Sequence, residues 1–215
     1  MHVFMIGDSV FDNAAYVGSG EPDVRKQVAE LLNGDRVSSA ARDGAVIASI
    51  RDQLTQRPPD ATHIVVSAGG NDALQSSNIL DARVSSMSAA LEMLAEVAEN
   101  FRRQYAGLLD QLASTRLPVG VCTIYDPRFP DARLRRAGTT ALTVLNDAIM
   151  REALVRRFAL IDLRLVCDRD EDFANPIEPS AAGGAKIARA ILDFASRAEQ
   201  STVVYGSTDR QEPSR

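Results

Sequence analysis

Short apolar runs alternate with longer segments of helical periodicity along most of the chain, and this alternation constrains the fold more than any other feature. The expected strands cover residues 3–6, 37–40, 63–67, 118–124 and 159–163. The expected helices cover residues 23–32, 46–54, 84–112, 140–158 and 182–195. Such alternation is typical of a parallel sheet with helices on both faces, and continuous apolar strands suit a sheet that is buried on both sides. We therefore predict an α/β fold.

The length of 215 residues suits one domain, and neither a linker nor an internal repeat interrupts the pattern. We place the domain at residues 1–196. Residues 197–215 are polar and lack periodicity, so we expect a flexible C-terminal tail.

Composition argues against several classes of function. A net charge of −5 and the absence of Trp argue against a nucleic-acid partner, which needs a basic face and stacking aromatic side chains. No segment approaches the roughly 20 apolar residues of a membrane span, so we expect no membrane partner. The start, "MHVFMIGDS", lacks the features of a signal peptide, which favours a cytoplasmic location. Cys122 and Cys167 are far apart and fit no metal or redox spacing.

Residues able to do chemistry follow four of the predicted strands. "GDS" at 7–9 follows the first strand, "DGA" at 43–45 the second, "GGND" at 69–72 the third and "NPIEPS" at 175–180 the fifth. Ligands of open α/β sheets bind outside the carboxyl ends of the strands. The four loops are therefore expected to meet at one edge of the sheet.

Three of these loops contain groups suited to acyl transfer. Ser9, at a tight strand-to-helix turn, could be a nucleophile with its own N–H as an oxyanion donor, or it could simply cap a helix. Gly44 lets the backbone approach a ligand, or is an ordinary turn residue. The Asn71 amide could hold a developing oxyanion, or could form an Asx turn with its own backbone.

Taken in order, "GDS", Gly44 and "GGND" resemble the first three sequence blocks of the SGNH, or GDSL, hydrolase family. "EPSAAGGAKIARAI" at 178–191 resembles the last block, so the resemblance extends from residue 2 to about 195. It implies a three-layer α/β/α sandwich around a five-stranded parallel sheet, similar to flavodoxin. Members of the family are mostly esterases, lipases, thioesterases and carbohydrate deacetylases.

The resemblance also implies roles for residues. Ser9 would be the nucleophile, and the oxyanion hole would consist of the Ser9 N–H, the Gly44 N–H and the Asn71 side chain. The partner would be a small-molecule acyl ester, with no metal and no organic cofactor implied. The chain departs from the family in the last block, where Asp-x-x-His-Pro supplies the acid and base. Asn175 stands at the Asp position here, and Glu178 at the His position.

Neither histidine is expected to replace the missing one. His2 and His63 begin their strands, and a five-residue strand is roughly 16 Å long, so neither should reach Ser9. Glu178 is then the best-placed base. An unperturbed glutamate has a pKa of about 4.3, which burial would raise toward the working pH. A hydrogen bond from the Asn175 amide to the carboxylate would lower the pKa, and the sequence leaves open which effect prevails.

The prediction is thus a serine ester hydrolase of the acylesterase, deacetylase or thioesterase type. One alternative is a non-catalytic protein of the same fold that binds a sugar or acyl ligand; another is a hydrolase with a different base, such as Asp72. Asp12, Asn13 and Tyr16 follow the nucleophile turn and could line the pocket mouth, or could cap a helix and pack. The polar segment 125–136 is expected to be a long loop at the active edge, its arginines meeting an anionic substrate or solvent.

Overall fold

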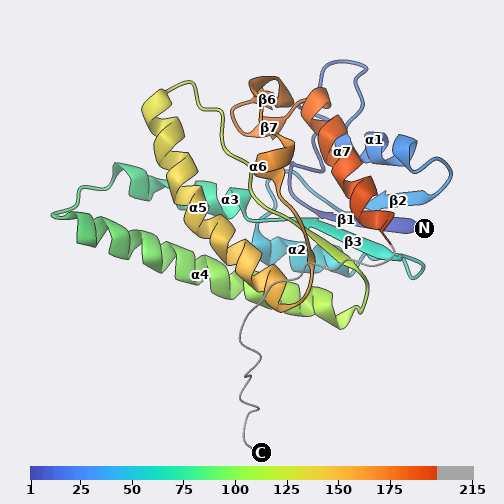
Figure 1. Ribbon diagram of the computed structural model, residues 1–215, viewed down its shortest axis with the longest axis horizontal. Helices are drawn as coiled ribbons and strands as arrows, with labels where there is room; N and C mark the ends of the chain where they lie inside the picture. The colour runs from blue at the N-terminus through green and yellow to red at the C-terminus, as the bar shows by residue number, and fades with distance from the viewer. Residues whose placement is uncertain (198–215) are drawn as a thin grey trace, which may run out of the picture.

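The computed structural model describes residues 1–197, and its centre is a five-stranded sheet (Figure 1). The strands are β1 (His2–Gly7), β2 (Arg36–Ser39), β3 (His63–Ser67), β4 (Val119–Cys122) and β5 (Ala159–Ile161). They lie in the order β2-β1-β3-β4-β5, and every neighbouring pair is parallel. The predicted parallel sheet is confirmed.

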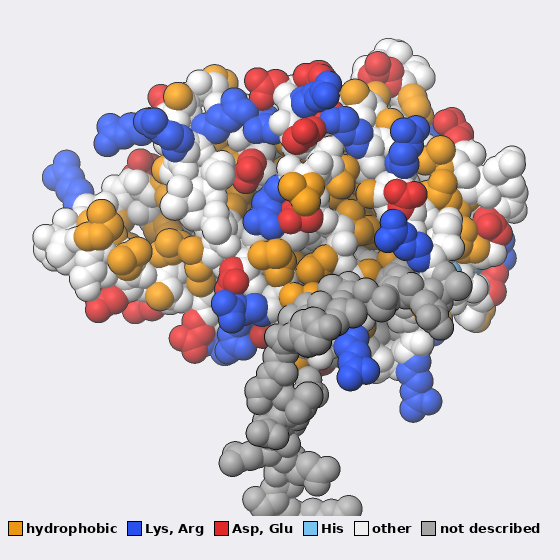
Figure 2. Space-filling view, viewed as in Figure 1, with side chains coloured by type: hydrophobic (Ala, Val, Ile, Leu, Met, Phe, Trp, Pro, Cys, Tyr) orange, Lys and Arg blue, Asp and Glu red, His pale blue; other side chains and the backbone are white. Residues whose placement is uncertain are grey.

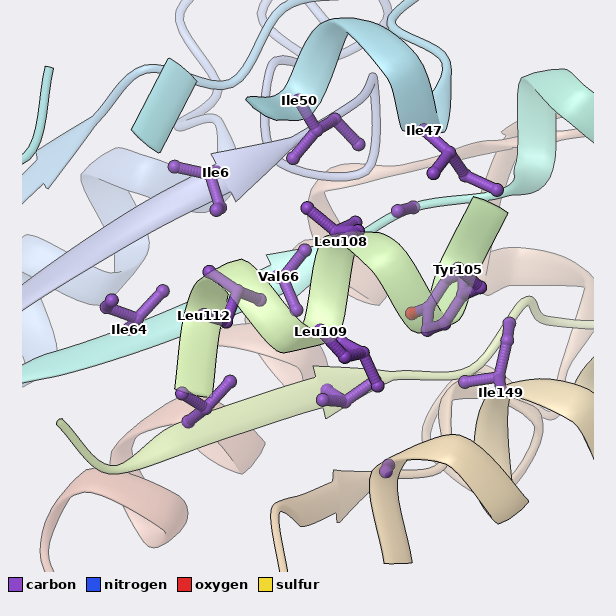
Figure 3. Packing of buried hydrophobic residues seen from close by; sticks show 14 of the residues in the cluster. Ile6, Ile47, Ile50, Ile64, Val66, Tyr105, Leu108, Leu109, Leu112 and Ile149 are labelled. Carbon is purple, nitrogen blue, oxygen red and sulfur yellow. The ribbon is translucent and has the colours of Figure 1, made fainter. Parts of the chain in front are cut away.

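Helices cover both faces of this sheet. On one face lie α1 (Val24–Leu31) and α7 (Ala181–Ala195), and on the other lie α2 (Ile47–Leu54), α4 (Met87–Ser114) and α5 (Ala132–Val155). Successive strand side chains point to opposite faces, so Val3 and Met5 pack in the first core whereas Phe4 and Ile6 pack in the second. Figure 3 shows the second core, where the α4 side chains pack toward the strands. The three-layer prediction is also confirmed.

The long helices begin where a polar side chain caps them. The side chains of Asp23, Ser86, Asp131 and Ser180 each accept a hydrogen bond from the backbone N–H three residues later. The cap at Asp131 corrects one prediction, because α5 begins at Ala132 and not near residue 140. The predicted long loop at 125–136 therefore ends at Asp131.

Several short elements were not predicted, because they contain too few residues to show a period. They are α3 (Gly70–Gln75), η1 (Ser77–Asp81), α6 (Leu163–Val166), η2 (Asp170–Asp172), β6 (Phe173–Asn175) and β7 (Glu178–Pro179). Two of them concern the site: Asn71 lies in the first turn of α3, and Glu178 begins β7 of the small β6–β7 hairpin.

The last helix, α7, ends at Ala195, close to the predicted domain end at 196. The predicted tail covers residues 197–215, of which all but Arg197 lie outside the described residues. Across residues 1–197 no helix combines the length and apolar character needed to cross a membrane. Both cysteines are buried free thiols.

Candidate active site

The nucleophile turn is pressed against the end of the neighbouring strand. Gly7 has a φ of +148°, and a Cβ at this position would collide with the carbonyl oxygen of Ser67 in β3. The side-chain amide of Gln53 fixes the same residue, because it accepts from the Gly7 N–H at 2.7 Å and donates to the Gly7 carbonyl at 2.9 Å. Only glycine suits this position, and it brings the "GDS" turn alongside the "GGND" turn.

Ser9 and Glu178, 169 positions apart in sequence, are hydrogen-bonded to each other. The Ser9 hydroxyl donates to Oε1 of Glu178 at 3.1 Å, within reach of direct proton transfer. Both residues are buried, with exposed fractions of 7% for Ser9 and 6% for Glu178. The other carboxylate oxygen, Oε2, has no hydrogen-bond partner within residues 1–197. The structure thus joins the predicted nucleophile and the predicted base.

Asn175 does not contact the Glu178 carboxylate in the way the sequence suggested. Its Oδ1 accepts hydrogen bonds from the backbone N–H groups of Ile177 and Glu178, at 2.9 and 3.0 Å. The residue therefore shapes the turn between β6 and β7, as asparagine often does through an Asx turn. The predicted bond from its amide to the carboxylate is wrong, and the role of Asn175 is to place the Glu178 backbone.

Asn13 was predicted at the pocket mouth, but its side chain is fully buried. Its amide donates to the carbonyl of Pro179 at 3.2 Å, and its Oδ1 accepts from the N–H of Val24 at 2.9 Å. The side chain thus ties the residue after Glu178 to the start of α1. We correct this prediction: Asn13 holds the loop that carries Glu178 and does not line the cavity described below.

Two further residues hold the same loop: Tyr125, which sequence reasoning did not single out, and Arg128, which was expected to meet an anionic substrate or solvent. The Tyr125 hydroxyl donates to the Ile177 carbonyl at 2.5 Å. The backbone N–H of Arg128 donates to the Pro176 carbonyl at 2.7 Å, and the Arg128 guanidinium lies 5.1 Å from the ring centroid of Phe173. Glu178 therefore lies on a loop that is fixed from several sides, as a preorganised catalytic group requires.

Burial raises the pKa of Glu178 from 4.5 to about 7. The hydrogen bond from Ser9 lowers the pKa, whereas the nearby carboxylates of Asp43 and Asp8 raise it further. Of the two opposing effects considered for this residue, desolvation prevails, since Asn175 does not bond to the carboxylate. A base whose pKa lies near neutral pH is well matched to general-base catalysis.

The predicted oxyanion donors lie in three turns, and the turns of Gly44 and Asn71 adjoin each other. Gly44 has a φ of +75°, and the Asn71 amide donates to the carbonyl of the next residue, Ala45, at 2.9 Å. Within residues 1–197, the backbone N–H groups of Ser9 and Gly44 donate to no protein acceptor. The Asn71 amide also keeps a second N–H. Ser9 and Asn71 line the cavity described below, whereas Gly44 does not, so the role of the Gly44 N–H as an oxyanion donor stays a prediction.

Asp12 and Tyr16 both bind the turn that contains Gly44. Asp12 accepts from the Asp43 N–H at 2.9 Å, and the Tyr16 hydroxyl donates to the Asp43 carboxylate at 2.7 Å. Neither residue lines the cavity described below. Their observed role is to hold the 43–45 turn, and contact with substrate stays a prediction.

A cavity of about 430 Å³ opens beside Ser9 and Glu178. It runs from the carboxyl ends of β3 and β4 toward the space between α3, η1, α4 and α5. Most of its wall is apolar, with Leu74, Ile79, Leu94, Ile124, Leu142 and Leu145 among the lining residues. The volume and apolar character are those of a site for a small organic ligand.

The other bases considered from the sequence are placed less well than Glu178. His2 and His63 begin β1 and β3, as predicted, at the opposite edge of the sheet from Ser9. Asp72 accepts a hydrogen bond from the Ile47 N–H at 3.0 Å and does not line the cavity. Among residues 1–197 there is no group of three or more His, Cys, Asp or Glu side chains able to hold a metal ion.

Sequence reasoning also passed over Asp8 and Ser67. The Ser67 hydroxyl donates to Oδ1 of Asp8 at 3.0 Å, and both residues line the cavity next to Ser9. A signal was available, because Asp8 is the middle residue of the "GDS" turn and Ser67 ends the strand that pairs with β1.

The chain is similar to solved structures of several hydrolases. The match to the extracellular lipase of Streptomyces rimosus covers 90% of this chain and 99% of the lipase, at 19% identity and a TM-score of 0.66. For phospholipase A1 of Streptomyces albidoflavus NA297 the shares are 90% and 98%, at 16% identity and a TM-score of 0.66. For Axe2, an acetylxylan esterase from Geobacillus stearothermophilus, they are 91% and 94%, at 16% identity and a TM-score of 0.62. At these identities the likeness shows the fold alone.

Sequence comparison identifies the family. No curated protein matches the sequence. The family profile described as "GDSL-like Lipase/Acylhydrolase family" matches residues 5–186, which is most of the chain and includes Ser9, Gly44, Asn71 and Glu178. The chain therefore belongs to the GDSL-like lipase/acylhydrolase family and is by class a hydrolase that acts on ester bonds.

Proposed function

We propose that the protein is a serine ester hydrolase in which Glu178 takes the place of the usual histidine. The observation that carries this proposal is the 3.1 Å hydrogen bond from the Ser9 hydroxyl to Glu178 Oε1, at the mouth of an apolar cavity. A serine and a base in hydrogen-bond contact, with the base fixed by its surroundings, form the arrangement of an activated nucleophile.

In the acylation step, Ser9 Oγ attacks the carbonyl carbon of the ester while its proton passes to Glu178. The carbonyl oxygen becomes an oxyanion, which the N–H groups of Ser9 and Gly44 and the Asn71 amide stabilise. The tetrahedral intermediate then collapses, and the departing alkoxide takes the proton back from Glu178. Water then attacks the acyl-enzyme while Glu178 accepts a proton from it. The bond between the acyl carbon and Ser9 Oγ breaks, Ser9 Oγ takes the proton from Glu178, and the free acid is released.

Glu178 can both accept the proton and return it, because a group with a pKa of about 7 is a usable base and a usable acid near neutral pH. An ordinary glutamate would be too weak a base for a serine hydroxyl. Asn175 has no imidazole to orient in this scheme. It keeps the carboxylate in place through the backbone of the β6–β7 turn.

The cavity indicates the acyl part of the substrate. Its walls are mostly aliphatic side chains, and an acetyl group would fill only a small part of about 430 Å³. Each methylene buried from water contributes about 0.8 kcal/mol, or roughly fourfold in binding. We therefore propose an apolar acyl group considerably longer than acetyl.

The rim of the cavity is apolar as well. Leu74, Leu80 and Leu134 line the cavity and are also partly exposed. Beyond them, Met87 and Leu91 of α4 are 75% and 59% exposed. Figure 2 shows hydrophobic side chains gathered over this end of the molecule, at the left of the view. A hydrophobic rim of this kind favours apolar substrates over free sugars.

The test is hydrolysis of nitrophenyl esters from acetate to decanoate by wild type and by Ser9→Ala. We expect a Ser9-dependent rate whose kcat/KM rises with chain length until the cavity is full. A serine-directed phosphonate should also label Ser9 stoichiometrically. An intact fold with no Ser9-dependent rate and no labelling would overturn the proposal and favour a non-catalytic protein that binds an acyl or sugar ligand.

A pair of variants on α5 tests the cavity separately. Ala141 lines the cavity, so Ala141→Phe should lower kcat/KM for the decanoate ester at least about tenfold and leave the acetate ester nearly unaffected. Thr143 lies two residues on and is exposed, so Thr143→Phe is the matched control. Equal losses on both esters, or from both variants, would contradict the assignment of this cavity to the acyl chain.

A further inference from the structure

Asp8 places a second buried carboxyl group beside the nucleophile, and the mechanism above does not use it. The residue directly precedes Ser9, lines the cavity and is 3% exposed. Carboxylic acids are rarely buried so completely unless a cation compensates them or the proton stays in place.

The carboxyl group bridges the two turns that carry the candidate catalytic groups. Its Oδ1 accepts from the Ser67 hydroxyl at 3.0 Å and from the Val10 N–H at 3.2 Å. Its Oδ2 lies beside Gly70, 3.7 Å from where a Cβ on that residue would be. Gly70 directly precedes Asn71, so the acid lies between the nucleophile turn and the proposed oxyanion donor.

The charged groups that face Asp8 are acidic. Asp72, on α3, raises the pKa of Asp8, and Asp8 in turn raises the pKa of Glu178, on β7. The side chains of Tyr105, Cys122 and Tyr125 face it from α4, β4 and the segment after β4, and their pKa values are raised too. Burial raises the pKa of Asp8 itself to about 7, although the hydrogen bonds from Ser67 and the backbone lower it.

The proposed reaction makes the charge on Asp8 consequential. It requires an ionised Glu178 at the start and creates an oxyanion on the substrate in the transition state. A third negative charge, on the residue next to Ser9 and out of contact with water, would repel both of them.

We propose that Asp8 is a positioning residue that works as a neutral carboxylic acid, keeping its proton on Oδ2 while Glu178 gives up its own. In this form it links the two turns through Oδ1 and adds no charge to the site. This inference rests on the proposed hydrolase function and extends it, because it assigns opposite protonation states to two carboxyl groups on either side of one serine. The active enzyme then needs one proton shared between the pair.

The consequence is a bell-shaped dependence of kcat/KM on pH. Activity rises as Glu178 loses its proton and falls as Asp8 loses its own, and the two apparent pKa values belong to the coupled pair. Asp8→Asn replaces the acid by a neutral group of the same shape. We expect this variant to lose the alkaline limb, and its acid limb to move to lower pH because one source of repulsion on Glu178 is gone.

The experiment compares three proteins from pH 5 to 9.5 on a medium-chain nitrophenyl ester, with the rate of Ser9→Ala subtracted. At pH 9 the wild type should have fallen about tenfold from its maximum, whereas Asp8→Asn should remain within about twofold of its own. Ser67→Ala is the matched control, because it removes the hydrogen bond and leaves the carboxyl group. It should retain the alkaline limb and shift it to higher pH, since the Ser67 bond lowers the pKa of Asp8.

An alkaline limb that stays unchanged in Asp8→Asn would overturn the inference, and so would a folded Asp8→Asn protein that is inactive at every pH. If the variant fails to fold, titration of the wild type by ¹³C NMR of labelled aspartate decides the matter without activity. With glutamate labelled as well, an Asp8 carboxyl resonance that titrates at a higher pH than that of Glu178 supports the inference, and one that titrates at a lower pH contradicts it. Absence of any Ser9-dependent rate would instead overturn the hydrolase proposal itself.

Discussion

The acids at the two ends of the central strands lie in different surroundings, since Asp60 near the amino ends is exposed, whereas Asp8 and Glu178 at the carboxyl ends are buried. At the amino edge, Nε2 of His2 is 2.9 Å from the Ser38 hydroxyl, and its Nδ1 is 3.2 Å from the Asp60 carboxylate. Arg36 forms an ion pair with Asp60. Burial raises the pKa of Asp60, but its own backbone N–H, Arg36 and His2 more than offset this, so its pKa lies below the usual value.

At the carboxyl ends of the strands, neither Asp8 nor Glu178 forms an ion pair within residues 1–197. Burial raises the pKa of both Asp8 and Glu178 to about 7, and their acidic neighbours add to the shift. Protein interiors normally avoid this arrangement, because unpaired charges are costly to bury. The comparison teaches that one end of the strands pairs its acid with a cation at the surface, whereas the other keeps buried, uncompensated acids where a reaction can use them.

The largest effect is expected from Ser9→Ala. Loss of the hydroxyl removes the nucleophile, so kcat/KM for a medium-chain ester should fall by roughly 10³-fold or more. Steady-state kinetics and a circular dichroism spectrum of the variant check this. A fold-intact variant that kept a tenth of the wild-type rate would show that the chemistry does not pass through this serine.

Asn71→Ala should have the next largest effect on catalysis. Removing one oxyanion donor typically costs roughly 10²-fold to 10³-fold in kcat. The same substitution breaks the bond to the Ala45 carbonyl, so the free energy of unfolding must be measured alongside kcat. A loss confined to KM would argue that Asn71 binds substrate and does not stabilise the oxyanion.

Glu178→Gln should stabilise the protein at alkaline pH while it impairs catalysis. The pKa of Glu178 is about 7 in the folded wild type and about 4.5 in the unfolded chain. Its contribution to the free energy of unfolding is therefore complete below pH 4.5 and is lost as the pH rises to about 7. The neutral glutamine avoids this loss. Urea unfolding should show a gain of roughly 1 to 3 kcal/mol at pH 8 and little change at pH 4. A variant less stable than wild type at both pH values would contradict the picture of an uncompensated acid.

The smallest effect is expected at the opposite edge. His2→Gln should lower the free energy of unfolding by about 1 kcal/mol, because its hydrogen bond to Ser38 and its contact with Asp60 are disturbed. Turnover should not change, since the residue lies at the far end of β1 from Ser9. A large loss of kcat at unchanged stability would break the division between the two edges.

The fold could be predicted almost completely from the sequence, because the strands are short continuous apolar runs and the helices show an amphipathic period. The segment 63–67 is an example: five residues with a buried apolar centre form β3 with the predicted bounds. The start of α5 was placed too late because residues 132–139 are mostly polar or small, and only the cap at Asp131 marks their helical state. Short elements such as α3 were missed because six residues hold less than two helical turns.

The site was predictable in part. The motif order singled out Ser9, Gly44, Asn71 and Glu178, and the strand ends explained why they meet. The detailed partners were not predictable, because a side chain such as Asn175 can bond to a carboxylate or to nearby backbone N–H groups, and the turn geometry decides between them. The burial of Asp8 was equally hidden, since it follows from the packing of elements distant in sequence.

The most direct test of the central claim is the pH dependence of kcat/KM for wild type and Glu178→Gln on the same ester. If Glu178 is the base for Ser9, the wild-type rate should rise with pH through an apparent pKa of about 7. In Glu178→Gln the rate should be roughly 10²-fold to 10⁴-fold lower, and the rise should disappear. A variant that turned over at nearly the wild-type rate, or that kept the same acid limb, would contradict the assignment of Glu178 as the base.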